Sequence, residues 1–99
     1  MKRFGNSVSF SLLYHPDVKK RDIPKLNNDI RKRVKRAIKT RLLPAPQDYG
    51  EPLRKTLKNY RKLRVGDYRI VFRIEGNEIF VLGICHHKEA YLLMEKRRD

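Results

Sequence analysis

The chain has 99 residues, and its 25 lysines and arginines against 11 aspartates and glutamates give a formal net charge of +14. That length predicts one domain, 1–99, and that charge indicates nucleic acid, a membrane surface or an acidic protein as partner. No apolar run approaches the ~18 residues of a membrane-spanning helix, and the single cysteine, Cys85, excludes an internal disulfide and fits a reducing cytoplasm.

The N-terminal part is predicted to form a strand and then a short helix. Apolar and serine residues alternate over Ser7 to Tyr14, which is the period of a half-buried strand. Pro16 then suits the first turn of a helix that is expected to end near Arg21. We therefore expect a strand and a helix in succession before residue 22.

A second, strongly basic helix is expected from about Ile23 to Arg41. Asp22 is suited to cap its N-terminus, and apolar residues recur at helical spacing, namely Leu26, Ile30, Val34, Ala37 and Ile38. From Lys19 to Arg41 the chain has 11 basic residues and two acids, a net charge of +9. Because so few acids can pair with these cations along the helix, its outward face is expected to bind an anion.

Two strands follow a loop that is predicted for Leu43 to Pro52, where three prolines and a glycine break regular structure. The strands are joined at Gly66-Asp67, a dipeptide suited to a type II′ turn. A two-residue turn places Val65 opposite Tyr68 and Arg64 opposite Arg69. The hairpin register can therefore be predicted residue by residue.

Alternation gives this hairpin one apolar face and one basic face. The apolar face has Leu63, Val65, Tyr68, Ile70 and Phe72, with Arg61 at its edge, and the basic face has Tyr60, Lys62, Arg64, Arg69, Val71 and Arg73. Like charges opposite each other destabilise a sheet by roughly some tenths of a kcal/mol. The pattern thus favours a polyanion on the basic face, although a solvated outer face is the simpler alternative.

The last third of the chain is predicted to form a central strand and a C-terminal helix. Glu78 to Ile84 is nearly all apolar, which is typical of a strand covered on both faces. Lys88 to Arg98 has apolar residues at helical spacing and a basic last turn. The predicted order is β-α-α-β-β-β-α, an α+β fold in which the last three strands are antiparallel.

Residues that suit RNA cleavage gather after the central strand. His86, His87, Lys88 and Tyr91 are expected beside the basic face. Cleavage of an RNA phosphodiester needs a base for the 2′-hydroxyl, cations for the phosphorane-like transition state and an acid for the leaving 5′-oxygen. Histidine is a suitable acid near neutral pH.

Other side chains of the basic region have predicted supporting roles. The cations Lys62, Arg64 and Arg69 suit phosphate binding. Aromatic rings stack on unpaired bases, and Tyr60, Tyr68 and Tyr91 are available for this. A metal site is not expected, since the adjacent residues Cys85, His86 and His87 would point to alternate faces of a strand.

The segment from Tyr60 to Phe72 and the later Cys85-His86-His87-Lys88-Glu89-Ala90-Tyr91 resemble the RelE/ParE superfamily of bacterial and archaeal toxins. The resemblance implies a RelE-like fold, an antiparallel sheet with two N-terminal helices on one side, and a toxin held by an acidic cognate antitoxin. RelE-type members cleave mRNA in the ribosomal A site without a metal or other cofactor. ParE-type members share the fold and inhibit DNA gyrase instead.

The resemblance also implies roles for individual residues. Lys62 matches an active-site lysine, Arg69 an arginine that contacts the scissile phosphate, and Tyr91 a catalytic tyrosine. His87 stands where RelE has an arginine, and related ribosome-dependent nucleases use a histidine in this region. The general base stays open between Lys62 and Tyr91. The full expected set is Lys62, Arg69, His87 and Tyr91 for catalysis, Arg64, Arg73, Tyr60 and Lys88 for substrate, and Arg31, Arg33 and Arg36 for the ribosome.

The expected function is therefore a ribosome-dependent mRNA endonuclease that inhibits translation, monomeric when free. A gyrase inhibitor that acts by protein binding is the alternative, and a plain basic RNA-binding module is a third interpretation. The pairing of candidate acid and base residues favours the endonuclease, because an inhibitor needs neither.

Overall fold

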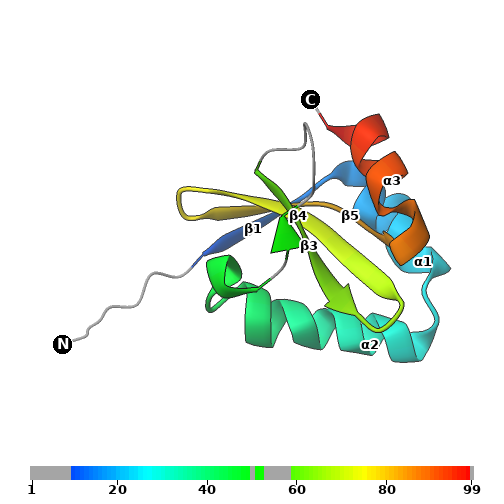
Figure 1. Ribbon diagram of the computed structural model, residues 1–99. Helices are drawn as coiled ribbons and strands as arrows, with labels where there is room; N and C mark the ends of the chain where they lie inside the picture. The colour runs from blue at the N-terminus through cyan, green and yellow to red at the C-terminus, as the bar shows by residue number, and fades with distance from the viewer. Residues whose placement is uncertain (1–9, 50, 53–58, 99) are drawn as a thin grey trace.

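The structure is a computed structural model that describes residues 10–49, 51–52 and 59–98 (Figure 1). The strands of this part of the chain are β1 (Ser11–Tyr14), β2 (Glu51–Pro52), β3 (Tyr60–Val65), β4 (Tyr68–Glu75) and β5 (Glu78–His86). Its helices are α1 (Ile23–Lys25), α2 (Asn28–Ala37) and α3 (Ala90–Arg97), with π-helical turns η1 (Val18–Asp22) and η2 (Ile38–Leu42) and 3₁₀ turns η3 (Pro46–Asp48) and η4 (His87–Glu89).

The strands form one sheet in the order β1-β5-β4-β3-β2. The predicted α+β class and the antiparallel pairing of β3, β4 and β5 are confirmed. The sheet as a whole is mixed, because β1 runs parallel to β5. The expectation of a purely antiparallel sheet is corrected at this edge, where helices and three strands separate the two partners and allow a parallel crossover.

The β3–β4 hairpin has the predicted register. Val65 pairs with Tyr68, Arg64 with Arg69, and Tyr60 with Arg73. Gly66 has a positive φ of 61°, and among the described non-glycine residues only Asn59 has a positive φ. A positive φ at the first central residue alone is the geometry of a type II′ turn, so the predicted turn is confirmed.

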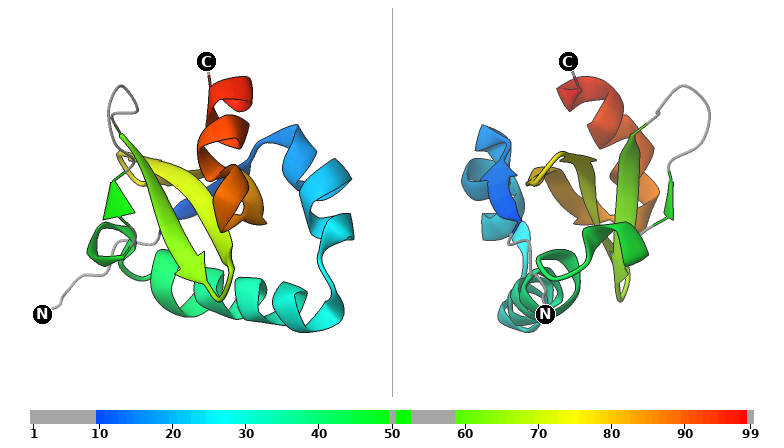
Figure 2. Two further views of the ribbon diagram at one scale, coloured as in Figure 1. Left: turned by 45° about the vertical axis from the view of Figure 1, so that its right-hand side comes forward. Right: turned by 90° about the vertical axis from the view of Figure 1, so that its left-hand side faces the viewer.

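Helices cover both faces of the sheet (Figures 1 and 2). On one face, Val34, Ala37 and Ile38 of α2 and η2 pack on the apolar face of the hairpin in the larger core cluster. On the other face, Ala90 and Met94 of α3 pack in a smaller cluster around Tyr60, Val71, Leu82 and Cys85. The basic face is thus partly covered by α3.

The helical region differs from its predicted boundaries. The single helix expected from Ile23 to Arg41 is interrupted at Leu26, which has an extended conformation with ψ 139°. Asn27 caps the following helix, since its side chain accepts a hydrogen bond from the Ile30 N–H at 2.9 Å. The prediction of Asp22 as the cap was wrong, because Asp22 is buried and binds other groups.

Three smaller differences concern the ends of elements. Strand β1 begins at Ser11, and the expected start at Ser7 lies outside the described residues. The predicted loop from Leu43 to Pro52 contains η3 and the short strand β2. The C-terminal helix is preceded by the 3₁₀ turn η4, so α3 itself begins at Ala90.

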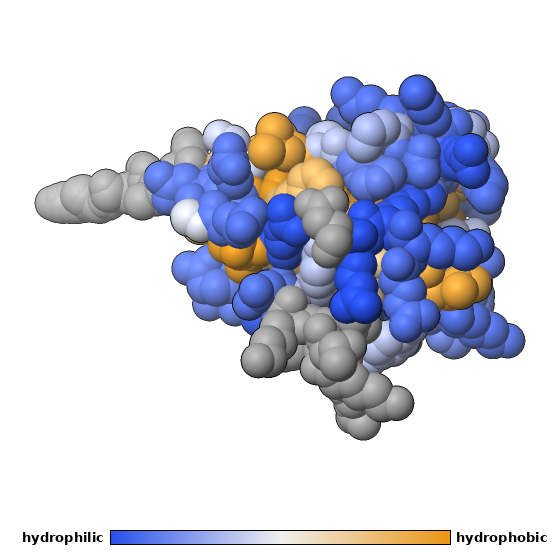
Figure 3. Space-filling model, turned by 90° about the horizontal axis from the view of Figure 1, so that it is seen from above, coloured by the Kyte–Doolittle hydropathy of each residue, from blue (hydrophilic) through white to orange (hydrophobic). Residues whose placement is uncertain are grey.

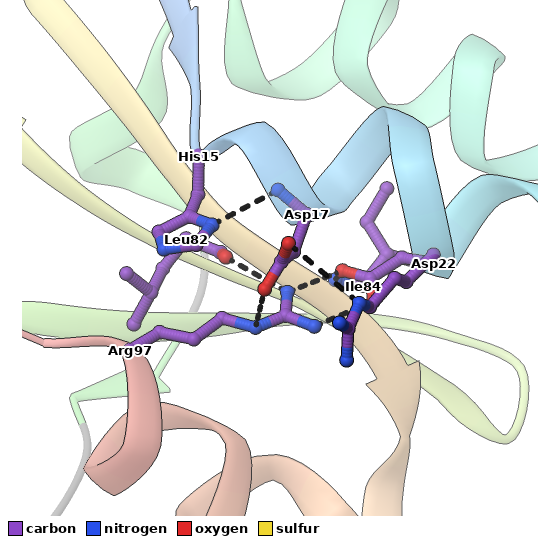
Figure 4. A network of polar contacts seen from close by, with 7 residues as sticks. His15, Asp17, Asp22, Leu82, Ile84 and Arg97 are labelled. Carbon is purple, nitrogen blue, oxygen red and sulfur yellow. Dashed lines mark hydrogen bonds and ion pairs between the residues drawn. The ribbon is translucent and has the colours of Figure 1, made fainter.

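An ion pair attaches α3 to η1, the helical turn that follows β1 in the chain (Figure 4). The Nη1 and Nη2 atoms of Arg97 donate to the two carboxylate oxygens of Asp22 at 2.7 and 2.9 Å. Arg97 Nη1 also donates to the carbonyl oxygen of Leu82 at 3.2 Å, and the Ile84 N–H donates to Asp22 at 2.9 Å. Hydrogen bonding to Asp22 raises the pKa of Arg97 above its ordinary value. The pair therefore fixes α3 to η1 and to β5.

The face seen from above presents mostly hydrophilic residues, with small and separate hydrophobic patches (Figure 3). None of the helices in the described part of the chain is long and apolar enough to cross a membrane. Among the described residues on this face, the hydrophobic patches are smaller than the broad apolar surface that marks a large hydrophobic interface.

Candidate functional site

Lys62 and Tyr91 meet on the face of the sheet that α3 covers. Lys62 lies in β3, and its Nζ atom is 5.5 Å from the centre of the Tyr91 ring. Tyr91 is in the first turn of α3 and is 40% exposed, so a ligand from solvent can reach it. The Lys62 ammonium and the Tyr91 ring therefore form a cation–π contact that a ligand from solvent can approach.

Arg69 is the first residue after Tyr68 in β4, and the hairpin turn fixes its side chain. Its Nη1 atom donates to the carbonyl oxygens of Gly66 at 3.1 Å and Tyr68 at 2.8 Å. Within the described part of the chain its hydrogen bonds use Nη1 alone. The remaining guanidinium N–H groups can therefore face an anion from a preorganised position.

His87 lies in η4, beside the same turn. Its backbone N–H donates to the Asp67 carbonyl oxygen at 2.8 Å, which ties η4 to the hairpin. Its exposed ring lies 4.4 Å, centre to centre, from the ring of His86. Partial desolvation, and then the positive charges of His86 and Arg69, lower the pKa of His87 below its ordinary value.

Lys62 with Tyr91, and Arg69 with His87, lie on one surface. Lys62 pairs with Val71 and Arg64 with Arg69, so Lys62 and Arg69 are diagonal neighbours on the basic face. Diagonal neighbours in a sheet are separated by roughly 7–8 Å between Cα atoms. The spacing suits a phosphodiester that contacts Arg69 and His87 at one end and Lys62 and Tyr91 at the other.

Two of the predicted substrate residues are occupied by internal contacts. The hydroxyl of Tyr60 accepts a hydrogen bond from Arg73 Nη1 at 2.8 Å, and Tyr60 is buried in the smaller core cluster. Arg73 also pairs with Glu75 at 3.2 Å and lies over the Phe80 ring at 4.9 Å. The structure gives both residues packing roles, and their assignment to the substrate stays a prediction.

The other predicted stacking and substrate residues lie in three different surroundings. The ring of Tyr68 is half-buried against the larger core cluster and meets His86 edge-on, with ring centres 5.8 Å apart. Lys88 is exposed, and its backbone N–H donates to His86 Nδ1 at 3.3 Å. Arg64 is opposite Arg69 in register, but it lines a different hollow together with residues of α2.

The three arginines predicted to bind the ribosome are also separated. Arg31 Nη2 donates to the carbonyl oxygens of Leu26 at 3.0 Å and Ile23 at 3.3 Å, so it stabilises the break before α2. Arg33 and Arg36 instead line the hollow that contains Arg64. The predicted set therefore divides into one arginine with a structural contact and two that share a surface.

Two further questions concern the state of Cys85 and whether any side chains could hold a metal ion. Cys85 is buried under α3, and burial raises the pKa of its thiol to about 12, so the thiol stays protonated near neutral pH. Among residues 10–49, 51–52 and 59–98, no cluster of three or more His, Cys, Asp or Glu side chains is arranged to hold a metal ion.

Sequence reasoning missed two features that shape this site. It did not identify the Asp22–Arg97 pair that fixes the helix carrying Tyr91, nor Arg41 as a neighbour of Arg33, Arg36 and Arg64. Both features depend on tertiary packing of segments that are distant in sequence, and no local pattern indicates them.

A family model described as the ParE toxin of the type II toxin–antitoxin system parDE matches residues 12–91. No curated protein sequence matches significantly.

Solved structures have the same fold. A chain of the toxin–antitoxin complex RelBE2 from Mycobacterium tuberculosis is 26% identical with a TM-score of 0.72, covering 81% of this chain and 100% of that one. A free mutant of the toxin RelE from E. coli is 19% identical with a TM-score of 0.67, covering 90% and 94%. A chain of a chromosomal ParDE system from P. aeruginosa is 19% identical with a TM-score of 0.64, covering 81% and 98%.

The family match covers most of the chain, and the folds of the solved toxins agree with it. The resemblance to the RelE/ParE superfamily that the sequence indicated is thereby confirmed. The chain belongs to the ParE toxin family of type II toxin–antitoxin systems, within the RelE/ParE superfamily.

Proposed function

We propose that this toxin is a ribosome-dependent, metal-independent mRNA endonuclease that inhibits translation. The observation that carries the proposal is the position of Lys62 Nζ, 5.5 Å from the Tyr91 ring centre, on the sheet face that also holds Arg69. One surface then carries a candidate base, Tyr91 or Lys62, and a phosphate-binding arginine, Arg69. The candidate acid, His87, lies beside the hairpin turn at the same surface.

The reaction is an attack by the ribose 2′-oxygen on the adjacent phosphorus. The base removes the 2′-hydroxyl proton, the new O–P bond forms, and the bond from phosphorus to the 5′-oxygen breaks. The products are a 2′,3′-cyclic phosphate and a 5′-hydroxyl that receives its proton from the acid. Every step uses proton transfer and charge stabilisation only, so no cofactor enters the balance.

The side chains divide these tasks according to their surroundings. Tyr91 and Lys62 are the two candidates for the general base, and the base takes the proton of the 2′-hydroxyl. Arg69 holds the non-bridging phosphate oxygens through its remaining N–H groups, which are fixed before substrate arrives. His87 protonates the leaving oxygen, and its lowered pKa makes the imidazolium a stronger acid.

A second candidate function is inhibition of DNA gyrase by protein binding. The match to a ParE family model favours it. The same basic surface would then contact a protein, and no acid or base would be required. The two candidates therefore differ in whether Tyr91 and His87 matter chemically.

An acidic cognate antitoxin is the proposed partner that controls either activity. The solved relatives include a RelBE2 toxin–antitoxin complex and a chromosomal ParDE system, and a net charge of +14 favours fast association with an acidic protein. Purification from the native operon should yield a complex, and recovery of free toxin alone from a strain that expresses the neighbouring gene would contradict this.

One pair of assays distinguishes the two functions. Purified toxin is added to a reconstituted translation reaction, in which the ends of the mRNA are mapped, and to a gyrase reaction, in which plasmid supercoiling is followed. Cleavage of mRNA within the ribosomal A site with unchanged supercoiling supports the endonuclease. Intact mRNA with blocked supercoiling establishes the gyrase inhibitor instead.

A further inference from the structure

A hollow of about 500 Å³ lies between α2, η2 and the turn end of β3. We call it the arginine hollow, because Arg33, Arg36, Arg41 and Arg64 all line it. Three of these residues come from the helical segment and the fourth from the sheet. The hollow therefore exists only in the folded chain, where α2 packs on the hairpin.

The arginine hollow concentrates positive charge without compensation. No Asp or Glu is among the described residues that line it. Within the described part of the chain, the ion pairs involve Arg21, Arg73 and Arg97, and none of the four hollow arginines. Four guanidinium groups around one opening repel each other, and a bound anion would relieve that repulsion.

Parts of the arginine hollow are held in place before any ligand arrives. The Arg33 guanidinium lies across Gly66, where a Cβ atom would come within 2.9 Å of its Nη1. The Thr40 hydroxyl donates to the Arg36 carbonyl oxygen at 2.8 Å, so it fixes the end of α2 rather than competing for a ligand. Arg64 lies on a paired strand.

The open side of β3 gives the arginine hollow access to a long ligand. β2 pairs only with Arg61 and Lys62, so in the described residues no strand pairs with the outer edge beyond Lys62. Arg64 is two residues from Lys62 on the same strand face, a distance of roughly 7 Å. A single extended polyanion can therefore contact the hollow and the basic face together.

We propose that the arginine hollow is a binding site for phosphate groups of the RNA backbone, separate from the groups that act in cleavage. The planar guanidinium fork matches phosphate oxygens in pairs, and four such forks suit consecutive phosphates better than isolated carboxylates. The choice of RNA as ligand rests on the proposed function. The site holds and orients the strand, and Lys62, Arg69, His87 and Tyr91 carry out the reaction.

The test uses three variants, of which the first two lose the same number of charges and the third loses none. One replaces Arg33, Arg36 and Arg64 with Gln, and its control replaces the exposed Lys32, Lys35 and Lys39 of the same helical segment with Gln. A third replaces the same arginines with Lys, which keeps the charge but removes the fork. The probe is a short single-stranded RNA with 2′-O-methyl groups throughout, which lacks the attacking hydroxyl and cannot be cleaved.

Binding is measured across a salt series for each protein. Three lost phosphate contacts, one for each replaced arginine, lower the slope of log affinity against log salt by about 2.1. The Arg-to-Gln variant should show that loss and bind at least about tenfold more weakly at 0.1 M salt. The lysine control should lose much less, and the Arg-to-Lys variant should lie between. Should the Arg-to-Gln variant fail to fold, RNA-induced shifts of arginine side-chain NMR signals in the parent provide the same test.

Equal slopes for the arginine and lysine variants would overturn the proposal. Unchanged RNA binding, together with loss of binding to poly-glutamate in the arginine variant, would also overturn it and assign the hollow to an acidic protein. The result can be separated from the cleavage assay, since an uncleavable RNA reports on binding without the reaction, and the comparison with the lysine control assigns the lost binding to the hollow.

Discussion

Arg97 and Arg33 show two opposite uses of the same side chain in one small protein. Arg97 is 13% exposed at its side chain and is paired with buried Asp22 at 2.7 Å. Arg33 is exposed, and within the described part of the chain it makes no ion pair. Each lies across a glycine, Gly83 under Arg97 and Gly66 under Arg33.

The difference indicates which cations serve the fold and which serve a partner. A charge that the fold buries must be compensated, because desolvation is expensive. A charge that remains in solvent costs little, and its repulsion from neighbours becomes useful when an anion binds. The absence of internal partners in the described structure is therefore a better guide to the binding surface than the number of cations.

Removal of Asp22 should have the largest effect on stability. Asp22→Ala leaves Arg97 buried without its carboxylate and the Ile84 N–H without its acceptor, and breaking a buried pair in this way costs about 3–5 kcal/mol. Urea unfolding followed by circular dichroism measures the loss. The control is Asp17→Ala, which removes a weaker contact at 3.8 Å to the same arginine. Equal, small losses for both variants would show that Arg97 is not a structural anchor.

Removal of the candidate acid or base should have the next largest effect, on rate rather than stability. His87→Ala and Tyr91→Phe should each slow mRNA cleavage by about 100-fold or more, which corresponds to about 2.7 kcal/mol of transition-state stabilisation. The measurement is the rate of A-site cleavage on programmed ribosomes. The control is Tyr49→Phe, an exposed tyrosine outside the site. Variants that cut mRNA at the parent rate would contradict the assignment.

The hairpin could be predicted in detail because its information is local. The two-residue turn at Gly66 and Asp67 sets the register, and strand alternation then assigns each side chain to a face. The helix boundary could not be predicted as well. Asp22 was the expected cap, but its carboxylate pairs with buried Arg97, and Asn27 caps α2 instead.

The candidate site was predicted in part for the same reason. Lys62 and Arg69 are diagonal neighbours because the hairpin register requires it, and Tyr91 lies beside Lys62 because α3 packs on that face. The arginine hollow was not predictable from the sequence. Strand alternation assigns Arg64 to the basic face of the hairpin and gives no sign that it lies near α2. The packing of α2 beside the open edge of β3 places Arg64 in the same hollow as Arg33, and a single sequence contains no signal for that arrangement.

A smaller effect is expected from filling the space beneath Arg97. A Cβ atom at Gly83 would lie 2.5 Å from Leu93 Cδ2 and 2.9 Å from Arg97 Nη1. Gly83→Ala should therefore push α3 away from β5 and destabilise the fold by about 1–3 kcal/mol, as overpacked cores do.

The matched control for this variant is Gly76→Ala, at a turn where nothing lies within 4 Å and the positive φ of 58° supplies the only strain. Thermal unfolding and cleavage rate are measured together for both variants. Because α3 carries Tyr91, Gly83→Ala should also slow cleavage, and Gly76→Ala should not. Parallel loss of activity in the two variants would show that the position of α3 does not matter to the reaction.

The smallest expected effect is a shift in pH dependence. The pKa of His87 is lowered by partial desolvation and by the charges of His86 and Arg69, whereas Asp67 raises it. A general acid acts in its protonated form, so the cleavage rate should fall as pH rises through this pKa, and the midpoint should lie below the ordinary histidine value of about 6.5. Asp67→Asn removes the charge that raises the pKa of His87, so it should move the midpoint further down. NMR titration of the His87 ring and the pH–rate profile should shift together, and a midpoint that rises in Asp67→Asn would remove His87 from the acid role.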